Sequence, residues 1–187
     1  IWAGEDEHYA TYSLSKAARE EIIKFARGER PYSRPTSSKL TSNRALLRPY
    51  QLEAVTSWQT NGRKGILEMA TGTGKTKTAL ACIESILADS ESSWLVIVAC
   101  PFQHLVDQWA DELELMEIET VRAHGDSSKW RPHASRMINR LLDGGQSAGF
   151  LVTTYATLGS DHLQFAVEPI ADKVMFIADE CHYLGAK

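Results

Sequence analysis

The seven residues from 70 to 76 are of types suited to binding a polyphosphate. Glycines within this segment let the backbone bend closely around phosphate oxygens, so that several N–H groups point inward. Lys75 can reach the β- and γ-phosphates of a nucleotide, and the hydroxyl of Thr76 can ligate Mg²⁺. The segment therefore predicts a site for ATP and Mg²⁺, and its residues are Ala70, Thr71, Gly72, Thr73, Gly74, Lys75 and Thr76.

Two observations bear on this phosphate site. The general pattern G-x-x-x-x-G-K-[ST] requires glycine at position 69, where the sequence has Met69. The glycines could also form a left-handed connection with no ligand. However, an apolar run at 65–69 precedes the loop and a helical pattern follows it. The positive end of that helix dipole would attract phosphate, so we favour the phosphate site.

A second chemical group is Asp179-Glu180-Cys181-His182, which directly follows the apolar run 174–178. Two adjacent carboxylates after a strand are often no more than a solvated turn. Downstream of a phosphate-binding loop, however, they have distinct roles. Asp179 would hold Mg²⁺, usually through water, and Glu180 would take a proton from the attacking water. We therefore predict that the two groups form one catalytic site.

Alternating strand and helix patterns would position these groups. Continuous apolar runs, typical of parallel strands covered on both faces, occur at 65–69, 94–99, 150–153 and 174–178. Apolar residues at helical spacing lie between and before them, at 52–58, 79–87, 105–116 and 137–142. This order predicts an α/β fold with a doubly wound, mostly parallel sheet and right-handed crossovers. Both chemical groups would then lie at the carboxyl ends of strands, where such sheets bind ligands.

The domain organisation follows from a change in composition near residue 43. Residues 1–42 are predicted to be an appendage with one short helix and a basic linker, and residues 43–187 to be the ATP-binding domain. Between Arg27 and Lys64 the sequence has eight basic residues and two acidic ones. Such a connector could follow a phosphate backbone, although a solvated linker is the favoured interpretation.

Whole-chain composition narrows the class of protein. A formal net charge of −4 argues against nucleic-acid binding by bulk electrostatics. Neither a membrane span nor a signal peptide is predicted. The three cysteines are far apart, with no spacing typical of zinc sites, and favour reduced thiols in a cytoplasmic setting. Cys82 and Cys100 are interpreted as small core residues.

The motifs together resemble those of superfamily-two DExH helicases and translocases, in particular restriction-enzyme motor subunits of the type III Res kind and the excision-repair helicase group. Four segments and a weaker fifth carry this resemblance. They are 47–51, similar to an adenine-reading segment; 70–76, similar to motif I; 101–109, similar to motif Ia; 179–182, a DExH form of motif II; and, more weakly, 152–158, similar to a T-T-Y segment. Residues 1–44 are not covered.

The resemblance implies a RecA-like lobe that binds ATP and Mg²⁺ and acts on nucleic acid. DNA is favoured over RNA by the subgroup alone. Arg48 and Gln51 would contribute to the adenine-reading segment, and His182 would sense the γ-phosphate. Family members hydrolyse ATP between two such lobes, and arginines from the second raise the rate by ~10³–10⁵. The sequence stops shortly after His182, so we expect the second lobe outside it and little hydrolysis by this chain alone.

Base and nucleic-acid contacts are predicted less directly. The amide of Gln51 can donate to adenine N7 and accept from its amine, although it could also be an exposed helix-start residue without a role. Pro101, Gln103 and His104 lie between a strand and a helix, where a phosphate or an ordinary capped turn is equally expected. Thr154 is a further candidate for nucleic-acid contact, with a buried strand position slightly favoured.

Other functions compatible with the sequence remain open. A P-loop ATPase of another class, acting on a non-nucleic-acid partner, is disfavoured because no L-S-G-G-Q signature occurs. A catalytically silent scaffold is disfavoured because Lys75, Thr76, Asp179 and Glu180 are all present. Trp58 and Trp109 lie on apolar helical faces and are assigned to the core rather than to base stacking.

Overall fold

The computed structural model describes residues 47–70, 72–88 and 93–184, all of which belong to a compact unit spanning residues 40–187. The predicted appendage and linker at 1–42 lie outside the described residues, as does Thr71 of the phosphate-binding loop. In the described part of the chain, none of the helices combines the length and apolar character that crossing a bilayer requires.

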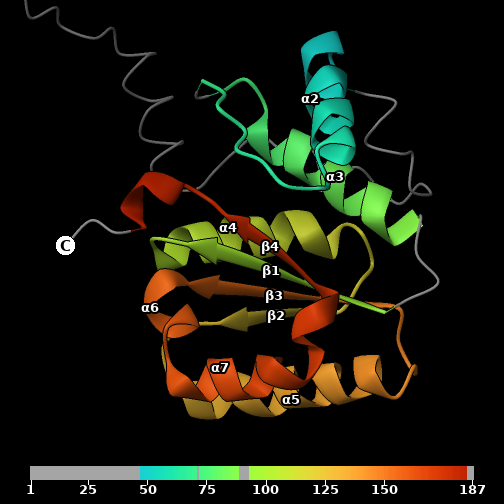
Figure 1. Cartoon of the computed structure of the whole chain (residues 1–187). Helices are drawn as coiled ribbons and strands as arrows, with labels where there is room; N and C mark the ends of the chain where they lie inside the picture. Colours follow the sequence, from blue (N-terminus) through green and yellow to red (C-terminus); the bar gives the residue numbers. More distant parts are fainter. Residues whose placement is uncertain (1–46, 71, 89–92, 185–187) are drawn as a thin grey trace, which may run out of the picture. The chain divides into compact units, whose positions relative to one another are not determined.

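Within the described ranges, four parallel strands form a sheet in the spatial order β2-β3-β1-β4 (Figure 1). The central strands β1 and β3 are almost entirely buried, as their continuous apolar sequences predict. The register aligns Ala99 of β1 with Ala178 of β4, and Cys100 with Thr154 of β3. The strands are β1 (Trp94–Cys100), β2 (Thr120–Ala123), β3 (Ala148–Thr154) and β4 (Val174–Ala178).

Helices cover both faces of this sheet, which confirms the predicted doubly wound α/β fold (Figure 1). The α-helices are α2 (Pro49–Thr60), α3 (Lys75–Ala88), α4 (Gln103–Glu114), α5 (Ser127–Leu142), α6 (Tyr155–Leu158) and α7 (Asp161–Val167). Two 3₁₀-helices, η2 (Glu168–Lys173) and η3 (Cys181–Tyr183), flank β4.

Side chains alternate along β1 between two hydrophobic clusters. Val96 and Val98 pack with α3 and α4 on one face, whereas Leu95 and Ile97 pack with α5 and α7 on the other. This period of two is the ordinary consequence of a pleated strand. Because α3 and α4 share a face, the phosphate-binding loop and the helix that follows β1 lie on the same side of the sheet.

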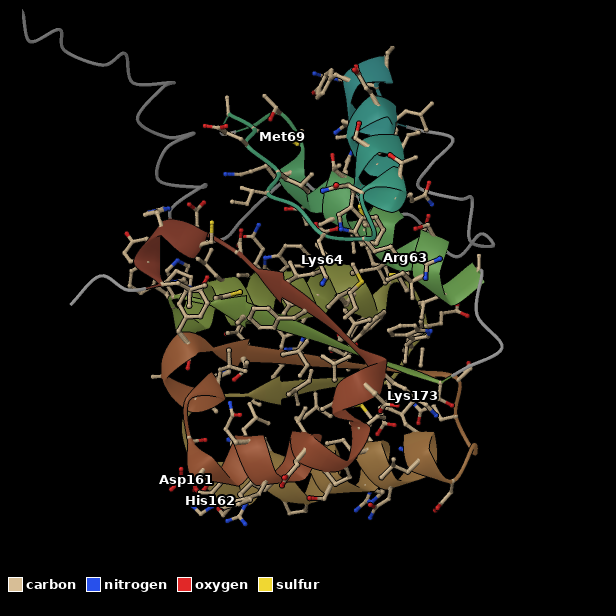
Figure 2. The ribbon with its side chains drawn as sticks, in the orientation of Figure 1. Arg63, Lys64, Met69, Asp161, His162 and Lys173 are labelled. Carbon is tan, nitrogen blue, oxygen red and sulfur yellow. The ribbon has the colours of Figure 1, made fainter. Side chains whose placement is uncertain are left out.

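The predicted strand at 65–69 is wrong, because residues 64–70 are irregular and none pairs with a strand of the sheet. The Met69 N–H instead donates to the Leu67 carbonyl at 3.0 Å, which closes a tight turn. Ile66 is 81% exposed, so the run does not have the two-sided burial that its sequence suggested. Figure 2 shows Met69 in the loop leading to α3, away from the sheet.

Candidate functional site

The phosphate-binding loop bends through two glycines just before α3 begins at Lys75. Gly72 has φ +80° and Gly74 has φ +91°, a left-handed backbone that side chains disfavour. A Cβ atom on Gly74 would also lie 2.5 Å from Nε2 of Gln51. The backbone conformation therefore favours glycine at 74, and a side chain there would also displace the Gln51 amide.

The start of α2 holds this loop from the side. The Tyr50 hydroxyl donates to the Thr73 carbonyl at 2.7 Å, and Gln51 Nε2 donates to the carbonyls of Thr73 and Gly74 at 3.1 and 3.2 Å. Gln51 Oε1 accepts from the Arg48 N–H at 2.8 Å. Both ends of the Gln51 amide thus have partners within the protein.

This arrangement bears on the proposed reading of adenine. Gln51 is 3% exposed, whereas the Arg48 side chain is exposed and lies near the Tyr50 hydroxyl. Adenine recognition by Gln51 stays a prediction, and it requires the amide to exchange its present partners. The loop-holding role of Gln51 was not predicted, although a glutamine three residues into a helix is a common capping signal.

The acidic group lies next to the phosphate-binding loop, as predicted. Glu180 Oε1 is 3.6 Å from Nζ of Lys75, and both side chains are about one-third exposed. His182 is exposed, and its Nδ1 lies 3.4 Å from Glu180 Oε2. Glu180 has φ +52°, a conformation that is uncommon for a residue with a side chain and is concentrated at functional sites.

Asp179 is fixed at three points by three different segments. Its N–H donates to the Ala99 carbonyl at 2.9 Å, extending the pairing of β4 with β1. The indole Nε1 of Trp109 donates to Oδ2 at 2.8 Å. The hydroxyl of Tyr155 donates to the Asp179 carbonyl oxygen. Asp179 is therefore held through both its backbone and its carboxylate.

The hydrogen bonds of Trp109 and Tyr155 to Asp179 were not predicted from the sequence. Trp109 does lie in the hydrophobic core, as predicted, with 5% exposure, but its indole N–H also has a specific polar partner. The indole N–H of a buried tryptophan usually has a hydrogen-bond partner, so the predicted burial of Trp109 already indicated that one exists. The pKa of Tyr155 is raised to about 12, mainly by burial and further by the acidic groups of Cys100 and Asp179 nearby. Its hydroxyl therefore stays protonated and remains a donor.

The donor chemistry at this site fits Mg²⁺. The cation prefers hard oxygen ligands and is usually held by one or two carboxylates together with substrate phosphates. Thr76 supplies a hydroxyl and Asp179 a carboxylate; no described residue donates a hydrogen bond to the second oxygen, Oδ1. No group of three or more His, Cys, Asp or Glu residues gathers as a metal site within the ranges described. The site is suited to a cation shared with nucleotide phosphates.

The segments predicted to contact nucleic acid follow neighbouring strand ends. Pro101 follows β1, and Gln103 and His104 begin α4, where both side chains are exposed. The rings of Phe102 and His104 stack with centroids 5.7 Å apart, and Phe102 meets Tyr183 edge-on at 5.5 Å. These aromatic contacts join the start of α4 to η3, directly after the acidic group.

Thr154 ends β3 and is 8% exposed. Its hydroxyl accepts from the Thr157 N–H at 3.2 Å and caps α6. Because Cys100 and Thr154 are in register, Pro101 and Tyr155 leave the same edge of the sheet. Nucleic-acid contact by Pro101, Gln103, His104 or Thr154 stays a prediction.

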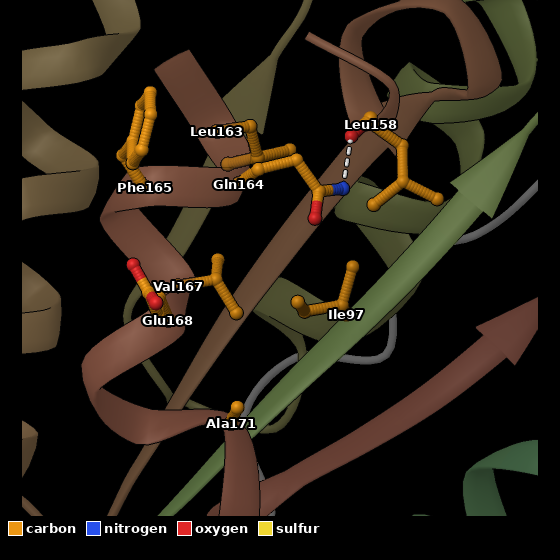
Figure 3. Close-up of a pocket in the computed structure, with 8 residues that line it drawn as sticks. All are labelled: Ile97, Leu158, Leu163, Gln164, Phe165, Val167, Glu168 and Ala171. Atoms are coloured by element: carbon orange, nitrogen blue, oxygen red, sulfur yellow. Dashed lines mark hydrogen bonds between the residues drawn. The ribbon is translucent and has the colours of Figure 1, made fainter. Parts of the chain in front are cut away.

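A separate pocket of about 430 Å³ lies on the α7 side of the sheet (Figure 3). Leu163 and Gln164 line it, together with Ile97 of β1, and Gln164 donates to the Leu158 carbonyl. None of the predicted site residues lines this pocket. It is therefore not the nucleotide site.

Comparisons with known proteins identify a family and a similar fold. The family described as "Type III restriction enzyme, res subunit" matches residues 44–187. One similar solved structure is a nuclease-deletion mutant of the Type ISP restriction-modification enzyme LlaGI in complex with a DNA substrate mimic, with a TM-score of 0.54 and 20% identity. The likeness covers 73% of this chain but 15% of that one, so it concerns a small part of a longer enzyme. None of the curated proteins compared matches the chain.

Proposed function

This chain belongs to the family of type III restriction enzyme res subunits, and we propose that it is the ATP-binding lobe of a DNA translocase or helicase of a restriction-type system. The observation that carries this proposal is the 3.6 Å approach of Lys75 to Glu180. It brings the phosphate-binding loop and the acidic pair to one place, although they are distant in sequence. A scaffold without catalysis has no need of this arrangement.

The residues suggest how the lobe would handle ATP. The backbone of the loop and the start of α3 would hold the phosphates, and Asp179 with Thr76 would hold Mg²⁺. Bound Mg²⁺ supplies positive charge to the phosphate oxygens. Phosphates would also replace Glu180 as the partner of Lys75. The released Glu180 carboxylate would then accept the proton of the attacking water.

Efficient hydrolysis is proposed to require a second RecA-like lobe. The proposal is supported by the helicases and translocases that the motifs resemble, which hydrolyse ATP between two lobes with transition-state arginines from the second. We therefore propose that this chain binds Mg²⁺-ATP but hydrolyses it slowly. DNA is the proposed partner because the family comprises restriction-enzyme subunits.

Replacing Lys75 tests the nucleotide site directly. We expect Lys75→Ala to weaken Mg²⁺-ATP binding by roughly tenfold or more, because a charge-assisted contact contributes ~1.5–3 kcal/mol. Isothermal titration calorimetry on the 187-residue chain would measure the change. The matched control is Lys77→Ala, because Lys77 is an exposed lysine two residues further along α3. Equal affinities of a folded Lys75→Ala variant and the unmodified chain would contradict the site.

A further inference from the structure

We propose that Trp109 and Tyr155 are positioning residues that hold Asp179 and link it to two segments predicted to contact nucleic acid. Trp109 acts on the carboxylate and Tyr155 on the main-chain carbonyl. This inference rests on the proposed function, because it assigns Asp179 to Mg²⁺. It adds two residues to the site and a physical connection between the nucleotide and nucleic-acid sides.

The contact of Trp109 with Asp179 fixes the orientation of the carboxylate. The indole N–H donates to Oδ2 at 2.8 Å, a charge-assisted hydrogen bond made by a 95% buried side chain. Val106 and Leu113 on the same face of α4 are fully buried, so the indole cannot easily move away. With Oδ2 engaged, Oδ1 is the oxygen left for Mg²⁺ or its water.

The contact of Tyr155 with Asp179 fixes the backbone. Tyr155 donates to the Asp179 carbonyl, while the Asp179 N–H donates to Ala99 of β1. The peptide that carries the clamped carbonyl leads into Glu180, whose φ is +52°. Because such a conformation persists only where surrounding contacts hold it, Tyr155 helps to position the proposed catalytic carboxylate as well.

Each positioning residue is joined to a predicted nucleic-acid segment by a short piece of secondary structure. Trp109 lies on α4, which begins with Gln103 and His104. Tyr155 directly follows Thr154, the cap of α6. A displacement at either segment would therefore change a hydrogen bond to Asp179. By thermodynamic linkage, if nucleic acid changes the affinity for Mg²⁺-ATP by some factor, Mg²⁺-ATP changes the affinity for nucleic acid by the same factor.

The chain contains a matched control for Trp109. Trp130 on α5 is also 5% exposed, but its indole N–H has no hydrogen-bond partner among the residues that the structure describes. Tryptophan-to-phenylalanine changes at 109 and 130 remove the same atoms from equally buried positions. Only the change at 109 removes a hydrogen bond to Asp179. A general loss of packing would affect both variants.

The first measurement is the dependence of ATP affinity on Mg²⁺, by calorimetry with MgCl₂ or with EDTA. Mg²⁺ should increase the affinity for ATP, and we expect this increase to be about tenfold smaller in Trp109→Phe. Loss of one hydrogen bond to a charged group implies an effect of this size. Trp130→Phe should keep the full gain. An unchanged gain in Trp109→Phe overturns the role of Trp109. Asp179→Asn is the reference: if it too keeps the full gain, the proposed metal site itself fails.

The second measurement is the change in Mg²⁺-ATP affinity caused by a saturating thymidine oligonucleotide. We expect a change in the unmodified chain that is reduced at least several-fold in Trp109→Phe and in Tyr155→Phe, but kept in Trp130→Phe. Tyr155→Phe keeps the ring and removes the hydroxyl, so it tests the link even if Trp109→Phe does not fold. No oligonucleotide effect in the unmodified chain, or an equal effect in all variants, overturns the link.

Discussion

Gln51 makes a structural contact that the sequence did not predict, while its proposed reading of adenine stays a prediction. Sequence reasoning assigned its amide to adenine, whereas the amide holds the carbonyls of Thr73 and Gly74. The proximity of Lys75 and Glu180 was predicted from their two motifs, although the strand expected before Lys75 does not form in the structure. The hydrogen bond from Trp109 to Asp179 could not be predicted, because helical periodicity identifies a buried face but not a hydrogen-bond partner.

Replacing Gln51 separates its two possible roles. Because the amide supports the loop that holds the phosphates, we expect Gln51→Ala to weaken ATP and GTP binding several-fold, since two hydrogen bonds to the loop of about 1 kcal/mol each are lost. If Gln51 also reads adenine, the loss of affinity is larger for ATP than for GTP. Competition calorimetry with both nucleotides would measure this. Equal losses of affinity for ATP and GTP would contradict the reading of adenine by Gln51 and leave only its support of the loop.

At the scale of elements, apolar runs predicted three strands correctly and one wrongly. The runs in β1, β3 and β4 were identified because continuous apolar sequence suits a strand buried on both faces. The run at 65–69 has a similar composition but no paired neighbour in the sheet. Strand β2 has four residues and α6 also four, too short for periodicity to detect.

The junction of the loop with α3 offers a test of local geometry. Gly72 and Gly74 both have positive φ, but only a Cβ on Gly74 would clash with Gln51. We expect alanine at either position to cost ~1–3 kcal/mol in backbone strain, with a larger loss of ATP affinity at 74. Urea unfolding and calorimetry on both variants would measure these effects. Equal losses of ATP affinity in the Gly72→Ala and Gly74→Ala variants would argue against the contact between Gly74 and Gln51.

Packing of the elements also predicts thiol reactivity. Burial raises the pKa of Cys82 to about 11, and burial together with the charge of Asp179 raises that of Cys100 to about 12. Cys181 is exposed. At pH 8 we expect Cys181 to react quickly with a thiol reagent and the other two only after unfolding, because thiolate is the reactive form. Fast labelling of Cys100 in the folded chain would contradict the packing of β1.

At the scale of the whole molecule, we propose that function requires a second lobe in addition to the described unit. Family membership and the doubly wound fold could be predicted from the sequence, because the motifs lie in a fixed order along alternating strands and helices. The described sheet presents the phosphate-binding loop, acidic group and predicted nucleic-acid segments around its carboxyl edge. Whole-enzyme properties, such as DNA-dependent movement, remain proposals for the chain together with a second lobe.

The most direct test of the proposed motor is to separate ATP binding from hydrolysis at Glu180, in a protein that also carries the second lobe. Glu180→Gln keeps the shape of the side chain but cannot accept a proton, which removes a contribution of ~10²–10⁴ in rate. We predict that this variant binds Mg²⁺-ATP normally but loses DNA-stimulated phosphate release, while Asp179→Asn weakens binding itself. Phosphate release that Glu180→Gln leaves intact, or that responds to neither DNA nor RNA in the unmodified protein, would contradict the account.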